Sequence, residues 1–144
     1  MTFLESRQES IENLCKDFGI DILYVFGSRS KEVVDFLSKD ELTLSPGPSD
    51  VDTGVRLIQG RELTVQEKVL LAIRLEDLLG VSRVDLVIIP EADPFLAADI
   101  IRGERLFARD EDEADEYELY ILRRAGDLVP LEREREQLIF KEEG

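Results

Sequence analysis

The sequence predicts an α/β domain in which strands and helices alternate along the chain. Three observations indicate this: short apolar runs of strand length, longer stretches with apolar residues at helical spacing, and turn residues between them. With 144 residues, the chain is long enough for one domain with its own hydrophobic core. Hydrophobic residues make up 43% and charged residues 35% of the chain, which is typical of a globular protein and not of a disordered one.

The first part of the chain contains two predicted helices and two predicted strands. Apolar residues recur at helical intervals from Ile11 to Phe18, after a helix start at Ser6 or Ser10. The next run is apolar apart from Asp21, so it predicts a strand buried in the sheet. The predicted order is a helix over residues 5–17, a strand over 20–26, a helix over 30–38, a loop over 44–49 and a strand over 51–58.

The second part of the chain continues the alternation. Thr64 and Glu67 form the pattern of a capping box, and Gly80 is a natural helix terminator. Gly126 and Pro130 interrupt the last helical run and predict two helices there. The predicted order is a helix over residues 64–79, a strand over 83–89 stopped by Pro90, a helix over 94–101, an extended piece over 104–109 and helices from residue 113 onward.

The charge balance limits the partners that the chain can bind. It carries 33 acidic and 18 basic residues, a formal net charge of −15, with no basic strip to offset it. Such a chain repels nucleic acid, so a DNA or RNA substrate is disfavoured. We expect a single domain over 1–144, with a catalytic α/β core over 1–109 and an acidic, helical C-terminal segment over 110–144.

The cysteine and histidine counts exclude several kinds of chemistry. The chain has no histidine, which removes Ser-His-Asp and Cys-His arrangements and nearly every zinc site. Cys15 is the only cysteine, so no internal disulfide forms, and its apolar neighbours favour a buried structural thiol. No apolar stretch approaches the roughly 18 residues of a membrane span, and the first residues do not resemble a signal peptide. These features predict a cytoplasmic protein.

A group of carboxylates and a small-residue turn form the candidate site. Gly27-Ser28 closes a strand, where backbone N–H groups can approach a phosphate closely. Asp50 and Asp52 lie one residue apart at the start of the next strand and point to the same face. Asp85 lies near the start of a third strand. Three carboxylates beside a phosphate-binding turn are typical of a site that holds Mg²⁺ against a nucleoside triphosphate.

Each of these residues also has a structural explanation. Gly27-Ser28 fits an ordinary strand-to-helix turn, Asp50 and Asp52 fit turn acids ahead of a strand, and Asp85 fits a wet strand end. The combination is more specific than its parts, because three crowded carboxylates repel one another unless a cation is present.

The same residues resemble a known family. Gly27-Ser28, then Ser49-Asp50-Val51-Asp52, then Asp85 resemble the signature of the minimal nucleotidyltransferases in the DNA polymerase beta-like superfamily. The resemblance implies a mixed sheet with helices on one side and the site at its edge. It also implies that Gly27 and Ser28 form the phosphate-binding turn, that Asp50 and Asp52 bind the metal, and that Asp85 is the third carboxylate. Ser49, Arg29 and Lys31 are further candidates for nucleotide binding, with a role at the helix start as the alternative for the last two.

The sequence departs from the family pattern at three places. Glu32 stands where the family usually has glycine, and residues 33–48 are longer than the usual loop. Thr53-Gly54 follows Asp52 in place of the common aliphatic residue. These departures leave the three carboxylates in place. They are expected to alter how the turn binds the triphosphate and the shape of the entrance to the site.

The resemblance further implies an activity and a partner. Many members are antitoxins paired with an all-helical HEPN-domain ribonuclease toxin, to whose tyrosine they transfer AMP from ATP with Mg²⁺. The acids over 110–118 and 132–136 are candidates for meeting a basic toxin surface, with a solvated helix face as the alternative. A binding-only antitoxin and an aminoglycoside-type nucleotidyltransferase stay open as other functions, and a polymerase-like RNA modifier is disfavoured by charge. The oligomeric state, including a homo-oligomer, also stays open.

Overall fold

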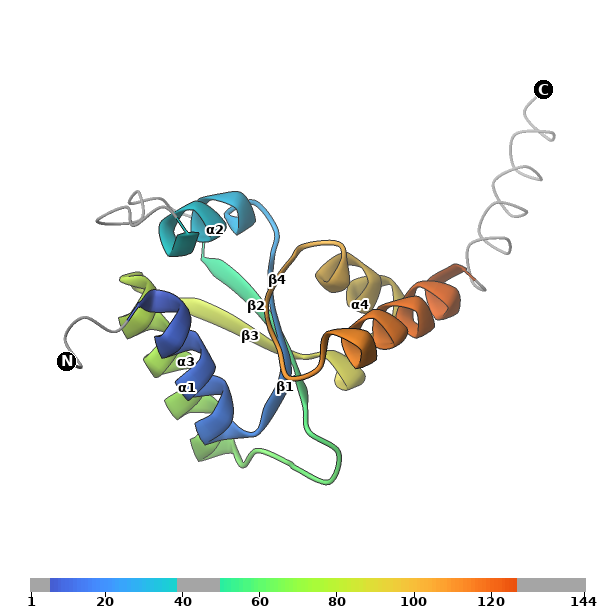
Figure 1. Ribbon diagram of the computed structural model, residues 1–144, viewed down its shortest axis with the longest axis horizontal. Coiled ribbons are helices and arrows are strands. Elements are labelled where there is room, and N and C mark those ends of the chain that lie inside the picture. Colours follow the sequence, from blue (N-terminus) through green and yellow to red (C-terminus); the bar gives the residue numbers. More distant parts are fainter. Residues whose placement is uncertain (1–5, 39–49, 127–144) are drawn as a thin grey trace, which may run out of the picture.

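The structure of the protein is a computed structural model, which describes residues 6–38 and 50–126. Strands and helices alternate along it, as the sequence predicts (Figure 1). Among the described helices, none is long and apolar enough to cross a membrane. The elements are α1 (Arg7–Phe18), β1 (Ile20–Phe26), α2 (Ser30–Ser38), β2 (Val51–Leu57), α3 (Val65–Leu79), β3 (Val84–Ile88), the short 3₁₀ helix η2 (Ile89–Glu91), α4 (Pro94–Ile101), β4 (Glu104–Ala108) and a helix over residues 111–126.

Local sequence signals set the ends of these elements. The Ser6 side chain accepts a hydrogen bond from the backbone N–H of Glu9 and begins α1. Thr64 and Glu67 make both hydrogen bonds of the predicted capping box at the start of α3, and Gly80 ends that helix. The predicted loop over 44–49 and the break at Pro130 lie outside the described residues, while residue 126 is still helical.

The four strands form one mixed sheet in the order β3-β2-β1-β4. β1 pairs with β2 and β4 in antiparallel fashion, and β2 pairs with β3 in parallel. The crossover from β2 to β3 runs through α3, as a parallel pair requires. Because β2 and β3 run in the same direction, the residues at their beginnings lie together, next to the end of β1.

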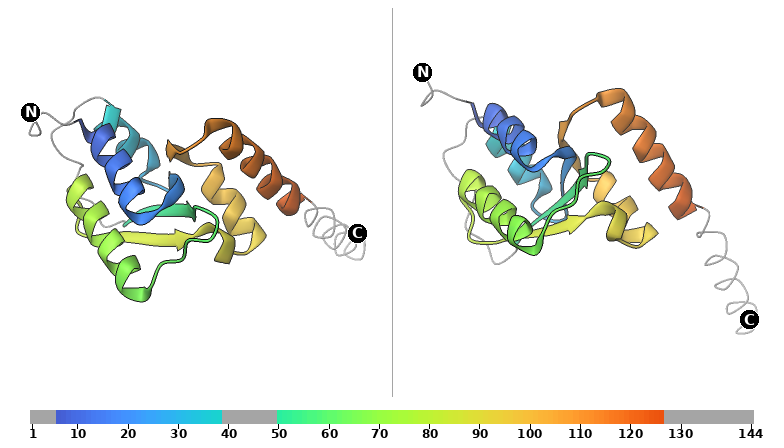
Figure 2. Two further views of the ribbon diagram at one scale, coloured as in Figure 1. Left: turned by 60° about the horizontal axis from the view of Figure 1, so that its bottom comes forward. Right: turned by 90° about the horizontal axis from the view of Figure 1, so that it is seen from below.

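Helices cover both faces of the sheet, which corrects the expectation of helices on one side. α1 and α3 pack on one face, and α4 and the helix over residues 111–126 pack on the other (Figures 1 and 2). The alternating side chains of β1 divide between the two cores: Leu23 and Val25 belong to one cluster, and Ile22 and Tyr24 to the other. The almost continuous apolar sequence of β1 is the physical reason, because both of its faces are buried.

Cys15 lies in the first of these cores, as predicted. Its side chain is fully buried, and burial, with a smaller contribution from the charge of Glu12, raises the pKa of the thiol well above its usual range. The thiolate is therefore not available at neutral pH, and Cys15 is a structural residue.

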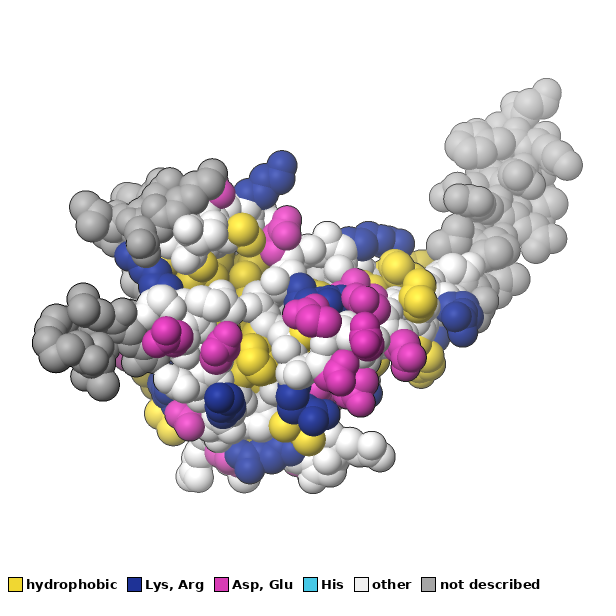
Figure 3. Space-filling view, in the orientation of Figure 1, with side chains coloured by type: hydrophobic (Ala, Val, Ile, Leu, Met, Phe, Trp, Pro, Cys, Tyr) yellow, Lys and Arg dark blue, Asp and Glu magenta, His cyan; other side chains and the backbone are white. Residues whose placement is uncertain are grey.

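The helix over residues 111–126 is held to the sheet by a network of charged groups. The Tyr24 hydroxyl donates to Glu118 over 2.6 Å, and Arg105 binds Glu118, Asp115 and Glu111. Burial acts to lower the pKa of Arg105, but these three carboxylates outweigh it and raise that pKa. Acidic side chains gather over the start of this helix (Figure 3), so part of the predicted acidic surface serves to attach the helix.

Candidate functional site

The turn after β1 places its backbone next to the candidate carboxylates. Gly27 adopts a φ of 81°, a left-handed conformation that favours glycine. A Cβ atom at this position would lie 2.7 Å from Oδ2 of Asp52. Ser28 is exposed in the same turn, and α2 begins two residues later. Glycine is therefore required here both for the turn and for the close approach of Asp52.

Sheet register brings two of the carboxylates side by side. Asp52 lies opposite Phe26, the last residue of β1, and opposite Asp85 in the parallel pair of β2 and β3. Neighbouring strands are about 4.8 Å apart, so the two aspartates start from adjacent backbone positions. Asp50 immediately precedes β2. The structure thus brings Gly27, Asp50, Asp52 and Asp85 to one edge of the sheet, as the sequence predicts.

The two residues after Asp52 attach β2 to its neighbours. The Thr53 hydroxyl donates to the backbone oxygen of Asp85 over 2.9 Å, which ties the two carboxylate-bearing strands together. A Cβ atom on Gly54 would lie 2.4 Å from a methyl carbon of Ile100, so glycine allows α4 to pack closely on β2. The departure from the family pattern at these positions therefore has a structural cause.

Mutual repulsion acts on the carboxylate at the centre of the site. Burial raises the pKa of Asp52, and the negative charges of Asp85 and Asp50 raise it further. The ionised side chain of Asp52 therefore destabilises the folded chain at neutral pH when no cation is bound. Oxygen ligands with this excess of negative charge fit a divalent ion such as Mg²⁺.

We expect Asp52→Asn to raise the melting temperature of the metal-free protein at pH 7 by about 1 to 3 °C. Because the folded-state pKa of Asp52 is raised, the penalty grows as the pH rises from the unfolded-state value, about 3.9, through the folded-state value. The two proteins should therefore melt alike near pH 3 and diverge toward pH 7. Thermal melts in a chelator across this range measure the difference, and a less stable variant at pH 7 would contradict the electrostatic explanation.

An arginine that the sequence analysis did not single out also lies at this edge. The Nε atom of Arg83 is 3.4 Å from Oδ2 of Asp50 and 3.4 Å from Oδ1 of Asp85. Arg83 lies two residues before Asp85 in the sequence. Because residues i and i+2 of a strand share a face, this spacing could have indicated that Arg83 lies near the carboxylates. In the part of the chain that the structure describes, no three acidic, histidine or cysteine side chains gather closely enough to hold a metal ion as they stand.

The other predicted nucleotide-binding residues lie near the turn but differ in their surroundings. Arg29 is buried and binds Glu32 through two hydrogen bonds, of 2.9 and 3.2 Å. This pairing raises the pKa of the Arg29 guanidinium and gives Glu32, which stands at the expected glycine position, a structural role. Lys31 is exposed in the first turn of α2. Ser49 lies outside the described residues, and nucleotide binding by all of these residues stays a prediction.

A cavity of about 560 Å³ lies at the other end of β2, around residues 56–63. Its cationic lining residues bind acids of the chain: Arg56 binds Asp21, Arg61 binds Glu67, and Lys68 lies 3.8 Å from Glu91. The carboxylates, by contrast, lie on the opposite edge of the sheet. Charge and register, and not the depth of a cavity, therefore identify the candidate site.

Comparison with known proteins agrees with this geometry. Residues 9–112 match the model of the family described as polymerase beta, nucleotidyltransferase. This range includes Gly27, Asp50, Asp52 and Asp85. No curated protein matches the chain significantly.

Several solved structures are similar to the chain over most of its length. A chain of a solved complex, described as tri-AMPylated Shewanella oneidensis HEPN toxin in complex with MNT antitoxin, matches at 22% identity, over 100% of both chains, with a TM-score of 0.56. A toxin–antitoxin complex with AMP-PNP matches at 22% identity, over 95% of this chain and 98% of that one, with a TM-score of 0.59. A minimal nucleotidyltransferase is 32% identical over 67% of this chain and 85% of its own, with a TM-score of 0.48. The first two likenesses show that the fold is shared.

Proposed function

Because the chain belongs to the polymerase beta nucleotidyltransferase family, we propose that it transfers AMP from ATP to a hydroxyl group of a partner protein. The observation that carries this proposal is the sheet register, which places Asp52 beside both Asp85 and the turn at Gly27. Carboxylates and a phosphate-binding turn at one edge supply what nucleotidyl transfer needs: charge to hold a metal and N–H groups to hold phosphates.

The three carboxylates would have different roles, in metal binding and in activation of the acceptor hydroxyl group. Asp50 and Asp52 would hold Mg²⁺ together with the nucleotide phosphates, and Mg²⁺ would supply positive charge against the charge that develops in the transition state. Asp85 would complete the metal site or accept the proton of the attacking hydroxyl group. Its place opposite Asp52, on a strand tied to β2 through Thr53, supports either role.

The transfer forms one bond and breaks another. The hydroxyl oxygen of the acceptor attacks the α-phosphorus of ATP and forms a new P–O ester bond, while the bond to the bridging oxygen of the β-phosphate breaks. Pyrophosphate leaves, and the hydroxyl proton passes to a carboxylate such as Asp85 or to water. In this reaction the Ser28 hydroxyl and the N–H groups of the turn would orient the triphosphate at the start of α2.

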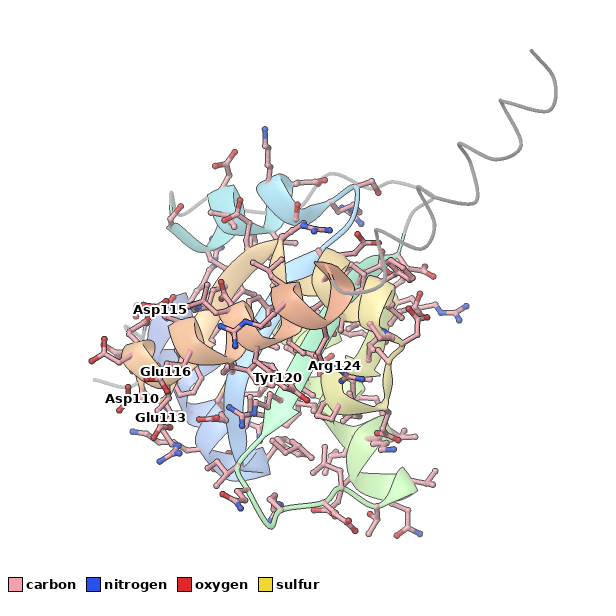
Figure 4. All side chains as sticks on the ribbon, turned by 90° about the vertical axis from the view of Figure 1, so that its right-hand side faces the viewer. Asp110, Glu113, Asp115, Glu116, Tyr120 and Arg124 are labelled. Carbon is pink, nitrogen blue, oxygen red and sulfur yellow. The ribbon has the colours of Figure 1, made fainter. Side chains whose placement is uncertain are left out.

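We propose an all-helical HEPN-type toxin as the acceptor. Support comes from the similar structures, two of which are toxin–antitoxin complexes, one containing a tri-AMPylated HEPN toxin. The net charge of −15 favours a basic partner, such as a protein that must attract RNA. The helix over residues 111–126 exposes Leu119, Tyr120 and Leu122 as well as acidic side chains. Figure 4 shows Tyr120 on the same helix as Glu113 and Glu116. This combination suits a partly apolar interface with a partner that has a basic rim.

Expression with the candidate toxin tests this proposal. We expect the two proteins to purify together, and the intact mass of the toxin to increase by whole AMP units when Asp50 and Asp52 are present. Co-expression of the toxin with the Asp50→Asn chain, under the same conditions, is the matched control and should leave the toxin unmodified but still bound. A toxin without added AMP beside the wild-type chain, with ATP and Mg²⁺ supplied, would contradict protein adenylylation.

A binding-only antitoxin of the same fold is the second candidate. Two observations favour it: Glu32 binds Arg29 at the turn, and the described carboxylates do not gather as a ready metal site. In that case the toxin would be neutralised by contact alone. Toxin activity that the Asp50→Asn chain suppresses as fully as the wild-type chain, with no modified toxin in either sample, would identify this function.

A further inference from the structure

Arg83 contacts two of the three carboxylates at once. Its Nε atom is equally distant, at 3.4 Å, from one oxygen of Asp50 and one oxygen of Asp85. These two aspartates come from different strands, so the guanidinium group links the start of β2 to the start of β3. A single positive charge thus lies between two negative charges that would otherwise repel each other.

The backbone of Arg83 is held by hydrogen bonds, while most of its side chain is exposed to solvent. The Arg83 carbonyl accepts a hydrogen bond from the N–H of Val51 over 3.3 Å, and the next residue, Val84, donates its N–H to Glu76 over 3.1 Å. The side chain of Arg83 is 69% exposed, compared with 35% for Asp50 and 45% for Asp85. The side chain can therefore turn into solvent without any change in the strands.

We propose that Arg83 is a built-in counter-ion of the carboxylate site, which must leave Asp50 and Asp85 when a divalent ion binds there. The inference rests on the proposed metal site and adds a competitor to it. In the metal-free protein, Arg83 reduces the repulsion between Asp50 and Asp85. Because these ion pairs must break when a divalent ion binds, they lower the affinity of the site for that ion. Exposed ion pairs are weak, so a divalent ion can displace the guanidinium group readily.

This role explains two features of the site together. The described carboxylates do not gather as a ready metal site, and the arginine contacts two of the three. It also predicts a direction: metal affinity in the absence of nucleotide should increase when Arg83 is replaced, because the ion no longer competes with the guanidinium group for Asp50 and Asp85.

Direct binding of Mn²⁺ tests the proposal, since Mn²⁺ shares the preference of Mg²⁺ for carboxylate oxygen and its free form is measurable by electron paramagnetic resonance. We expect nucleotide-free Arg83→Gln to bind Mn²⁺ about 3- to 10-fold more tightly than the wild type, because each exposed pair is worth only a few-fold. Arg61→Gln is the matched control. It removes the same charge from an exposed ion pair with Glu67, at the far end of β2.

A third variant separates the contact from the charge. Arg83→Lys keeps the positive charge but has a methylene group where the contacting Nε atom lies, so its Mn²⁺ affinity should fall between those of the wild type and Arg83→Gln. Circular dichroism melts confirm that all variants fold. An Arg83→Gln affinity no higher than that of Arg61→Gln, or an Arg83→Lys affinity equal to that of Arg83→Gln, would overturn the role of Arg83 and leave the metal site intact. Failure of every chain to bind Mn²⁺ would overturn the proposed metal site as well.

Discussion

Asp52→Asn should slow nucleotide transfer by about 10²-fold or more, since a metal-held charge stabilises a phosphoryl transition state by several kcal/mol. The substitution keeps the shape of the side chain and removes its charge at the point where β2 lies between the end of β1 and the start of β3. The initial rate of pyrophosphate release, in the presence of Mg²⁺ and the acceptor, measures the effect.

The control for Asp52→Asn is Asp17→Asn. Asp17 is an exposed carboxylate near the end of α1, paired with Arg74 over 2.9 Å, and its loss removes the same charge outside the candidate site. We expect the control to keep the wild-type rate. Because Asp52→Asn should not weaken the fold, a slow rate in that variant would reflect lost chemistry, whereas a wild-type rate would remove Asp52 from the active site.

Gly27→Val should weaken ATP binding by about 10-fold or more without unfolding the chain. A branched side chain at a φ of 81° strains the backbone, and its Cβ atom would lie 2.7 Å from Oδ2 of Asp52. Both the phosphate-binding turn and the neighbouring carboxylate would therefore shift. Titration calorimetry with a non-hydrolysable ATP analogue and Mg²⁺ measures the loss of affinity.

Gly60→Val separates backbone strain from the effect on the site. Gly60 has a similar φ of 86°, but nothing lies within 4 Å of a Cβ atom there, and it belongs to the loop after β2, far from Asp52. We expect this control to lower stability slightly and to leave nucleotide affinity unchanged. If Gly27→Val bound the analogue as tightly as the control, the turn would be only a connection between β1 and α2.

Much of the fold follows from local sequence signals. Strand β1 and helices α2 and α4 have the predicted bounds, and the caps at Ser6 and Thr64 begin their helices as expected. These features depend on residues a few positions apart, which a sequence pattern records directly. The presence of helices on both faces of the sheet depends on long-range packing. In the sequence, only the apolar residues on both faces of β1 indicated that both faces are covered.

Part of the candidate site was likewise predictable from the sequence, and part was not. The grouping of Asp50, Asp52 and Asp85 was predictable from their positions along the strands. Asp50 and Asp52 lie two residues apart and so share a face, and Asp85 lies near the start of the neighbouring parallel strand. The contacts of Arg83 with two strands, and the pairing of Glu32 with Arg29, were not predicted. These contacts depend on the directions of the side chains, which the sheet register and the turn geometry determine. A single sequence shows which residues are present but not which of them meet across two strands or within a turn.

The most direct test of the central claim is the fate of the label from ATP. The purified chain is incubated with Mg²⁺ and its acceptor, once with ATP labelled at the α-phosphate and once with ATP labelled at the γ-phosphate. If Asp50, Asp52 and Asp85 carry out nucleotidyl transfer, the acceptor gains the α-label and never the γ-label, and Asp52→Asn lowers the rate of α-label incorporation by about 10²-fold or more. Incorporation of the γ-label, or α-label incorporation by Asp52→Asn at the wild-type rate, would contradict it.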